Sequence, residues 1–155
     1  MSGKRQRRRV GDVVSIPLGP DKYGFGLILE GPLIAFYDYQ ADEPNPAGII
    51  ETLRNKSVAF VLWVMNYAVT GGRWTVIGRM EIPESLREKP KFFMQDALSG
   101  EVSITTDGGD RIPATKEQCA GLERAAVWDP EHVEDRLVDH FASRPNKWVE
   151  SLRLR

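Results

Sequence analysis

The sequence YGFGLILEGPLIAFYDY, at residues 23–39, alternates large apolar residues with small ones on both sides of a break. Up to Leu29 the alternation has a period of two, which is typical of a strand with one face in the core. Gly31-Pro32 interrupts the pattern, and residues 33–39 continue it. We therefore expect two strands joined by a tight connection. Glycines along one side of the first strand indicate either a sharply bent small barrel, as in an SH3-like fold, or the close approach of another backbone.

Segments on both sides of this stretch also carry strand patterns. The apolar run at residues 58–65 predicts a central strand covered on both faces. After a turn at residues 70–73, residues 74–82 alternate and predict the hairpin partner of that strand. The remaining expected strands are residues 13–18, a hairpin of residues 102–106 and 111–114 around Asp107-Gly108-Gly109-Asp110, a short extended segment at residues 91–94, and a closing strand at residues 148–154.

The clearest helix signal is Asp129, an N-cap residue, followed by Pro130 at the first helical position. Apolar residues then recur at four-residue spacing, and the helix should end two residues before Pro145. Shorter helices are expected at residues 49–54 and within residues 83–89. The sequence thus predicts an α+β fold, with a strongly bent, mostly antiparallel sheet, an SH3-like N-terminal part and a C-terminal helix.

Length and charge indicate one domain with a basic arm. At 155 residues the chain fits a single core, so we expect residues 10–155 to form one domain and residues 1–9 to be a flexible basic arm. The formal net charge is -1, and because the arm carries five basic residues, the rest of the chain carries -6. An acidic body favours a positively charged partner.

Three features of the sequence indicate where the protein works. No apolar run follows the basic N-terminus, so we do not expect a secretion signal. The longest apolar run is far shorter than the roughly 20 residues of a membrane-spanning helix. Cys119 is the only cysteine, which excludes an intramolecular disulfide and a four-thiolate zinc site. We therefore expect a cytoplasmic protein.

The sequence shows no pattern typical of an active site, a metal site or a cofactor site. His132 and His140 lie about 80° apart around the expected helix, unlike the i, i+4 pair of zinc hydrolases. Cys119 lacks the neighbours found in thiol proteases, and we expect it to be structural. We therefore expect no enzymatic activity, no metal and no cofactor. A hydrolase that uses Cys119 or a histidine is the lowest-ranked alternative.

The basic arm at residues 4–9 is the best signal for nucleic acid, because clustered cations replace counterions on phosphates. A nucleic-acid surface normally adds stacking aromatic residues, and Tyr23 and Phe25 could serve only if they point outward. We therefore expect the arm to be a solubilising tail and do not expect nucleic acid as a partner. A small nucleic-acid-binding regulator that uses the arm is the alternative function.

The aromatic residues indicate a protein interface. They are more numerous than a core of this size requires, and Tyr, Trp and Arg are the types that anchor interfaces. Of these aromatic residues, Tyr37-Asp38-Tyr39, and Phe92-Phe93 next to Lys91, are the ones we most expect to be exposed, although core packing is the stronger expectation for each residue taken singly. The expected partner-binding residues are Tyr37, Asp38, Tyr39, Arg73, Phe92 and Phe93.

Several short stretches follow one another in a characteristic order from the end of the arm to the C-terminus. They are Val10-Gly11-Asp12-Val13-Val14, Gly24-Phe25-Gly26, Ile34-Ala35-Phe36-Tyr37-Asp38, Phe60-Val61-Leu62-Trp63-Val64-Met65, Gly72-Arg73-Trp74 with Ile77-Gly78, Lys91-Phe92-Phe93, Gly121-Leu122-Glu123-Arg124-Ala125-Ala126-Val127-Trp128 and Asn146-Lys147-Trp148-Val149-Glu150-Ser151-Leu152. Together they resemble the immunity protein 26 family of bacterial polymorphic toxin systems.

The resemblance implies a protein that is encoded beside a toxin and protects the producing cell by binding and blocking that toxin. Its partner would be the cognate toxin, and the acidic body suggests a basic toxin such as a nuclease. The resemblance implies no catalytic residues. It leaves open the identity of the toxin, the location of the interface and the oligomeric state.

Overall fold

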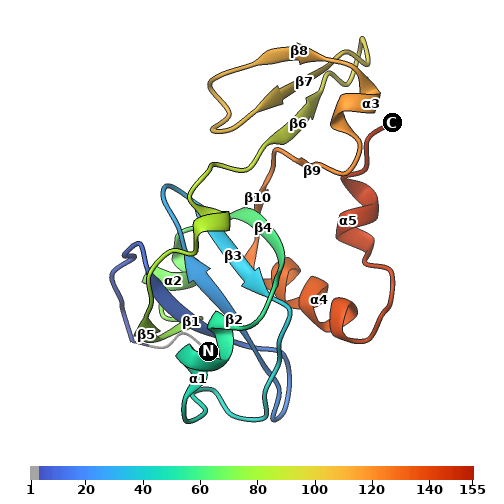
Figure 1. The fold of residues 1–155 in the computed structure, drawn as a ribbon. Helices are drawn as coiled ribbons and strands as arrows, with labels where there is room; N and C mark the ends of the chain where they lie inside the picture. Colours follow the sequence, from blue (N-terminus) through green and yellow to red (C-terminus); the bar gives the residue numbers. More distant parts are fainter. Residues whose placement is uncertain (1–3) are drawn as a thin grey trace. The chain divides into compact units, whose positions relative to one another are not determined.

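The computed structural model describes residues 4–155 and confirms the expected α+β class, with two mixed sheets and a C-terminal helix. Six of the eight strand pairings among these residues are antiparallel. The chain forms two compact units (Figure 1). The first unit runs up to Ile82 and includes Val127–Asn146, and the second comprises Pro83–Ala126 and Lys147–Arg155. The SH3-like character of the N-terminal part stays a prediction.

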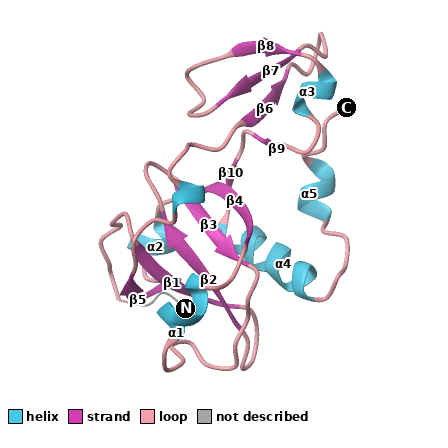
Figure 2. Cartoon of the chain, viewed as in Figure 1, coloured by secondary structure: helices cyan, strands magenta, loops and turns pink. Residues whose placement is uncertain are grey.

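The first unit is built on a six-stranded sheet (Figure 2). Its strands are β1 (Asp12–Pro17), β2 (Tyr23–Ile28), β3 (Leu33–Tyr37), β4 (Val58–Val64), β5 (Thr75–Arg79) and β10 (Val127–Trp128). Their spatial order is β10-β4-β3-β2-β1-β5, so the stretch at residues 23–39 supplies the two central strands. The pairing shifts between Val13 and Val14 of β1 and between Phe36 and Tyr37 of β3. Bulges of this kind bend a sheet.

One face of this sheet is covered by α4 (Pro130–Phe141), the helix that the sequence predicts most clearly. As expected, Asp129 caps it, because its Oδ1 accepts a hydrogen bond from the backbone N–H of Glu131 at 2.9 Å. Leu137 is fully buried against β2. A Cβ atom added at Gly24 would lie 3.4 Å from a methyl carbon of Leu137, which is van der Waals contact, so the helix lies directly on this strand.

Two short helices complete the first unit. The predicted helix after the proline-rich loop is α1 (Ile49–Arg54), which buries Ile49 and Leu53. Its Ile50 packs on β5, where a Cβ atom added at Gly78 would lie 3.1 Å from Cδ1 of Ile50. A single helical turn, α2 (Tyr67–Thr70), follows β4. This turn was not expected from the sequence.

The expected hairpin between residues 58–65 and 74–82 is wrong. β5 pairs with β1, at the opposite end of the sheet from β4, and β4 lies between β3 and β10. A hairpin needs a tight turn, whereas α2 carries the chain away from β4 before β5 begins. Burial also alternates along β4, so this strand is not fully covered on both faces as its apolar run predicted.

The second unit contains a smaller, four-stranded sheet. Its strands are β6 (Phe92–Gln95), β7 (Val102–Thr105), β8 (Ile112–Ala114) and β9 (Glu123–Arg124), in the order β8-β7-β6-β9. The expected hairpin of β7 and β8 is confirmed. In its turn, the carboxylate of Asp110 accepts hydrogen bonds from the Thr105 hydroxyl and from both the backbone N–H and the hydroxyl of Thr106. The bonds from the Thr105 hydroxyl and from the Thr106 backbone lower the pKa of Asp110.

Three helical segments accompany this sheet. They are a 3₁₀ turn at Glu84–Leu86, within the residues where a helical turn was predicted, α3 (Lys116–Cys119) and α5 (Lys147–Ser151). The expected closing strand at residues 148–154 is therefore wrong. Its apolar positions suit a helix as well as a strand, and periodicity cannot separate the two in so short a segment.

Prediction for the central strand β2. Gly26→Ala should lower the free energy of unfolding by about 1–3 kcal/mol, because the added Cβ atom would lie 3.0 Å from Cγ2 of Ile34 and 3.3 Å from Cγ2 of Val14. Gly24→Ala is the matched control, because its new contacts are with the flexible ends of Leu18 and Leu137. We expect it to stay within about 1 kcal/mol of the unaltered chain. Urea unfolding measures both, and equal losses would contradict this account.

Candidate interaction surface

The structure places three of the six expected partner-binding residues in the interior. Tyr37, Phe92 and Phe93 are 1%, 1% and 3% exposed, so the expectation that they are exposed is wrong. Tyr37 lies in β3, its hydroxyl donates to the Met80 sulfur at 3.5 Å, and burial raises its pKa to about 12. Phe92 and Phe93 lie in β6, which has a neighbouring strand on each side. These three side chains contribute to packing.

Asp38 and Tyr39 lie at the end of β3 and are accessible in part. Oδ1 of Asp38 lies 2.8 Å from Nε2 of His140, which connects this strand end to the last turns of α4. The Nζ atom of Lys56 lies 5.2 Å from the centre of the Tyr39 ring. Both residues are therefore on the first unit and can be reached by a partner.

Arg73, the sixth expected residue, is fixed by α4. Its guanidinium donates two hydrogen bonds to the carboxylate of Glu134, at 2.7 and 2.8 Å. The indole N–H of the buried Trp74 donates to the same carboxylate at 2.9 Å. The hydrogen bonds to Glu134 raise the pKa of Arg73 above its ordinary value. Glu131 lies farther away, at 3.8 Å, and is well exposed.

Next to this group lies an exposed aromatic residue that the sequence analysis did not select. The hydroxyl of Tyr67 donates to Oδ2 of Asp129 at 3.0 Å, yet the residue is 49% exposed. Burial of the hydroxyl and the nearby Asp129 carboxylate raise its pKa. Met65, two residues earlier, is 43% exposed. We define the Tyr67 surface as Met65, Tyr67, Arg73, Asp129 and Glu131.

The solvent side of α4 carries a row of carboxylates beside the Tyr67 surface. Glu131, Asp135 and Asp139 are spaced i, i+4 and i+8, which places them on one side of the helix. We call them the acidic ridge. Part of the charge of Asp139 is balanced by Arg144 and Asn146, at 3.1 and 2.9 Å. Like charges at this spacing destabilise a helix by a few tenths of a kcal/mol each, so the ridge has a small cost in helix stability.

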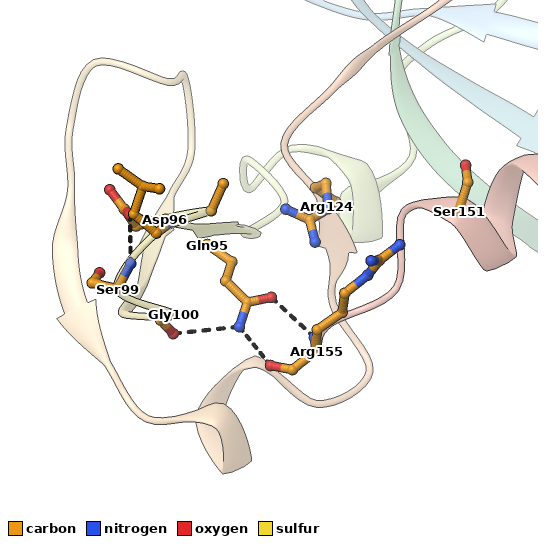
Figure 3. Close-up of a pocket in the computed structure, with 9 residues that line it drawn as sticks. Gln95, Asp96, Ser99, Gly100, Arg124, Ser151 and Arg155 are labelled. Carbon is orange, nitrogen blue, oxygen red and sulfur yellow. Dashed lines mark hydrogen bonds between the residues drawn. The ribbon is translucent and has the colours of Figure 1, made fainter.

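The second unit contains a hollow of about 490 Å³ (Figure 3). The side-chain amide of Gln95 links two segments that line this hollow. The Gln95 Nε2 donates to the carbonyl of Gly100, and the Gln95 Oε1 accepts from the backbone N–H of Arg155. Arg124 donates to the carbonyls of Leu152 and Arg153. These polar groups hold the C-terminal segment in place and so have a structural role. The lining residues are Gln95, Asp96, Ala97, Leu98, Ser99, Gly100, Arg124, Ser151 and Arg155.

Of the catalytic candidates in the sequence, Cys119 is buried and His140 is paired. Cys119 is buried, and burial raises the pKa of its thiol, which disfavours the nucleophilic thiolate. His140 is paired with Asp38 on the surface. Among residues 4–155, no three His, Cys, Asp or Glu side chains gather in a way that could hold a metal ion. None of the helices in this part of the chain is long and apolar enough to cross a membrane.

Comparison with known families identifies the chain. The model of the family described as immunity protein 26 matches residues 9–103, more than half of the sequence, and the chain belongs to this family. The match includes β1 to β6, Tyr67 and Arg73, whereas α4 and the resembling stretches after residue 103 lie outside it. Searches of curated proteins and of solved structures found no match.

Prediction for the contacts of α4. Glu134→Ala should lower the free energy of unfolding by about 1–3 kcal/mol, because the buried indole N–H of Trp74 would lose its acceptor. Glu131→Ala, on the same helix and with the same change of charge, should change it by less than about 0.5 kcal/mol, since Glu131 is exposed and only loosely paired. Chemical unfolding followed by tryptophan fluorescence compares the two. Similar losses would show that Glu134 does not hold the helix.

Proposed function

We propose that this chain is a cytoplasmic immunity protein that binds and neutralises the toxin encoded beside it, without chemical change to either protein. Membership of the immunity protein 26 family supports this function. The arrangement of the first unit supports a binding role, because an exposed tyrosine, a methionine and a fixed arginine adjoin a row of carboxylates. The Tyr67 surface is the observation that carries the proposal.

The Tyr67 surface has the composition of an interface centre. Tyr and Arg are the residue types most often found to dominate binding energy, and Met is enriched in interfaces. The bond to Asp129 and the pairing with Glu134 hold Tyr67 and Arg73 in place before any partner arrives. Less side-chain freedom is then lost on binding. Such a surface suits a tight complex.

Charge favours a basic toxin. Outside residues 4–9, the first unit has seven basic and 13 acidic residues, whereas the second unit has nine of each. The acidic excess is therefore in the unit that carries the acidic ridge. A toxin that cleaves nucleic acid needs positive charge to hold phosphates, so we propose a nuclease toxin. Opposite charges would speed its encounter with α4.

The proposed toxin-binding face extends from the Tyr67 surface across the acidic ridge to Asp38 and Tyr39. A helix of 12 residues is about 18 Å long, and a standard interface covers about 800 Å² on each partner. One toxin can therefore contact both ends of α4. Tyr37, Phe92 and Phe93 are not included, because they are buried.

Prediction for Tyr67. Tyr67→Ala should weaken binding of the purified toxin at least about 30-fold, because removal of a central aromatic residue commonly costs 2 kcal/mol or more. Leu98→Ala is the control: Leu98 is 99% exposed, belongs to the second unit, and should change the dissociation constant less than threefold. Isothermal titration or surface plasmon resonance measures both. If Tyr67→Ala binds like the unaltered chain, the Tyr67 surface is not the interface.

Prediction for the mode of protection. Cells that express the adjacent toxin should survive when this chain is co-expressed, and purified toxin should lose all activity at one equivalent of the chain, because a non-covalent inhibitor acts by occupancy. Toxin activity is titrated against increasing amounts of the chain. Complete inactivation by a small fraction of one equivalent would indicate an enzyme. Cell death despite abundant folded protein would refute the immunity function.

A further inference from the structure

The basic segment at residues 4–9 is fixed to the first unit rather than free. The backbone N–H of Gln6 donates to the carbonyl of Thr70, and its side-chain amide donates to the carbonyls of Val69 and Trp74 at 2.9 and 2.7 Å. Its Oε1 accepts from the backbone N–H of Val76 at 2.8 Å. Gln6 therefore covers the edge of the sheet where β5 begins. Residues 1–3 of the predicted arm lie outside the described residues.

Arg8 provides a second anchor. Its guanidinium donates to the carbonyls of Leu29 and Leu33, at 2.9 and 2.8 Å, across the connection between β2 and β3. Burial lowers the pKa of Arg8, and the hydrogen bonds of its guanidinium go to carbonyls rather than carboxylates. The segment is thus held at two points, on α2 with β5 and on the β2–β3 connection.

The residues between and before the anchors point outward. Lys4, Arg5 and Arg7 are exposed, and none forms an ion pair or hydrogen bond with the residues that the structure describes. Several other basic residues of the first unit form ion pairs. Examples are Lys22 with Asp42, Arg54 with Glu51, Arg73 with Glu134, Arg79 with Asp12 and Arg144 with Asp139. We call Lys4, Arg5 and Arg7 the basic strip, because these exposed cations lie close together in the sequence and have no ion pair or hydrogen bond within the described chain.

We propose that the basic strip binds the phosphate backbone of nucleic acid without regard to sequence. Guanidinium and ammonium groups neutralise phosphates, and phosphate contacts fix position without reading bases. Residues 4–9 contain no apolar or aromatic side chain, whereas a protein interface needs an apolar centre and sequence-specific recognition of single strands needs stacking. The composition therefore favours a phosphate backbone over a protein. This activity is separate from the proposed binding of a toxin.

Binding should be measured with the full chain by fluorescence anisotropy, using a 20-nucleotide single-stranded DNA and a 20-base-pair duplex in 50 to 200 mM NaCl. Three phosphate contacts predict a slope of log affinity against log salt of about -2.7 for the duplex, which is about a 40-fold loss over this range. For the single strand the slope should be about -2.1. No binding at 50 mM NaCl would overturn the proposal.

Charge-matched variants distinguish binding by the basic strip from a general effect of the protein's net charge. The triple variant K4A/R5A/R7A should bind at least tenfold more weakly, with a slope near zero, and should fold normally because these side chains have no partner in the described chain. K22A/R54A/R144A removes the same charge from paired surface positions and should change affinity less than threefold. Equal losses in the two triple variants would overturn the proposal.

The anchor is tested by Gln6→Ala, which keeps every charge but frees the strip. Affinity should fall severalfold while the salt slope stays the same, because a mobile strip loses more freedom on binding. Thermal melting checks that this variant folds, and K4A/R5A/R7A gives the decisive result if it does not.

Competition with polyglutamate tests whether the strip binds acidic polypeptides as well as nucleic acid. If it displaces DNA as well as unlabelled DNA of equal charge does, the strip binds acidic chains in general and the assignment to nucleic acid is wrong.

Discussion

The carboxylate of Glu134 is the acceptor on which the arrangement of the proposed toxin-binding face depends. It receives two hydrogen bonds from Arg73 and one from Trp74, whose ring is fully buried and nearly perpendicular to that of Phe36, with 5.7 Å between the ring centres. A shift of α4 along the sheet would leave the buried indole N–H without a partner, at a cost of about 1–3 kcal/mol. The same position of the helix brings Asp129 to Tyr67. The position of α4 therefore determines both the packing of the core and the placement of the exposed tyrosine.

The parts of the fold that local chemistry determines could be predicted from the sequence. The alternation of large apolar and small residues, interrupted at Gly31-Pro32, predicted β2 and β3. Asp129 followed by Pro130 predicted the start of α4. Pairing between distant segments could not be predicted in the same way. The pairing of β5 with β1 rather than with β4 depends on α2. This helical turn has only four residues and no strong helix signal, so the sequence did not predict it.

The candidate surface was harder to predict than the fold, because exposure is a tertiary property. Tyr37 lies at the end of one apolar run and Tyr67 lies two residues after another, and this placement does not show which of them is exposed. The structure buries the first beside Met80 and leaves half of the second in solvent. Arg73 was selected for its residue type and lies on the Tyr67 surface, although Glu134 holds it there. The acidic ridge is the one part of the candidate surface that has a sequence pattern of its own, namely three carboxylates at four-residue spacing.

Charge is separated within the first unit in a way that bears on both proposed activities. Ion pairs neutralise many of the basic side chains of this unit. Helix α4 carries four acidic side chains and one arginine, and the basic strip forms no ion pair with the residues that the structure describes. At physiological salt the Debye length is about 8 Å, and each surface then acts mainly on what comes close to it. A basic toxin is attracted by the acidic ridge and repelled by the strip, whereas a phosphate backbone experiences the reverse. Because one partner cannot satisfy both surfaces, the separation of charge keeps the two sites from competing for the same ligand.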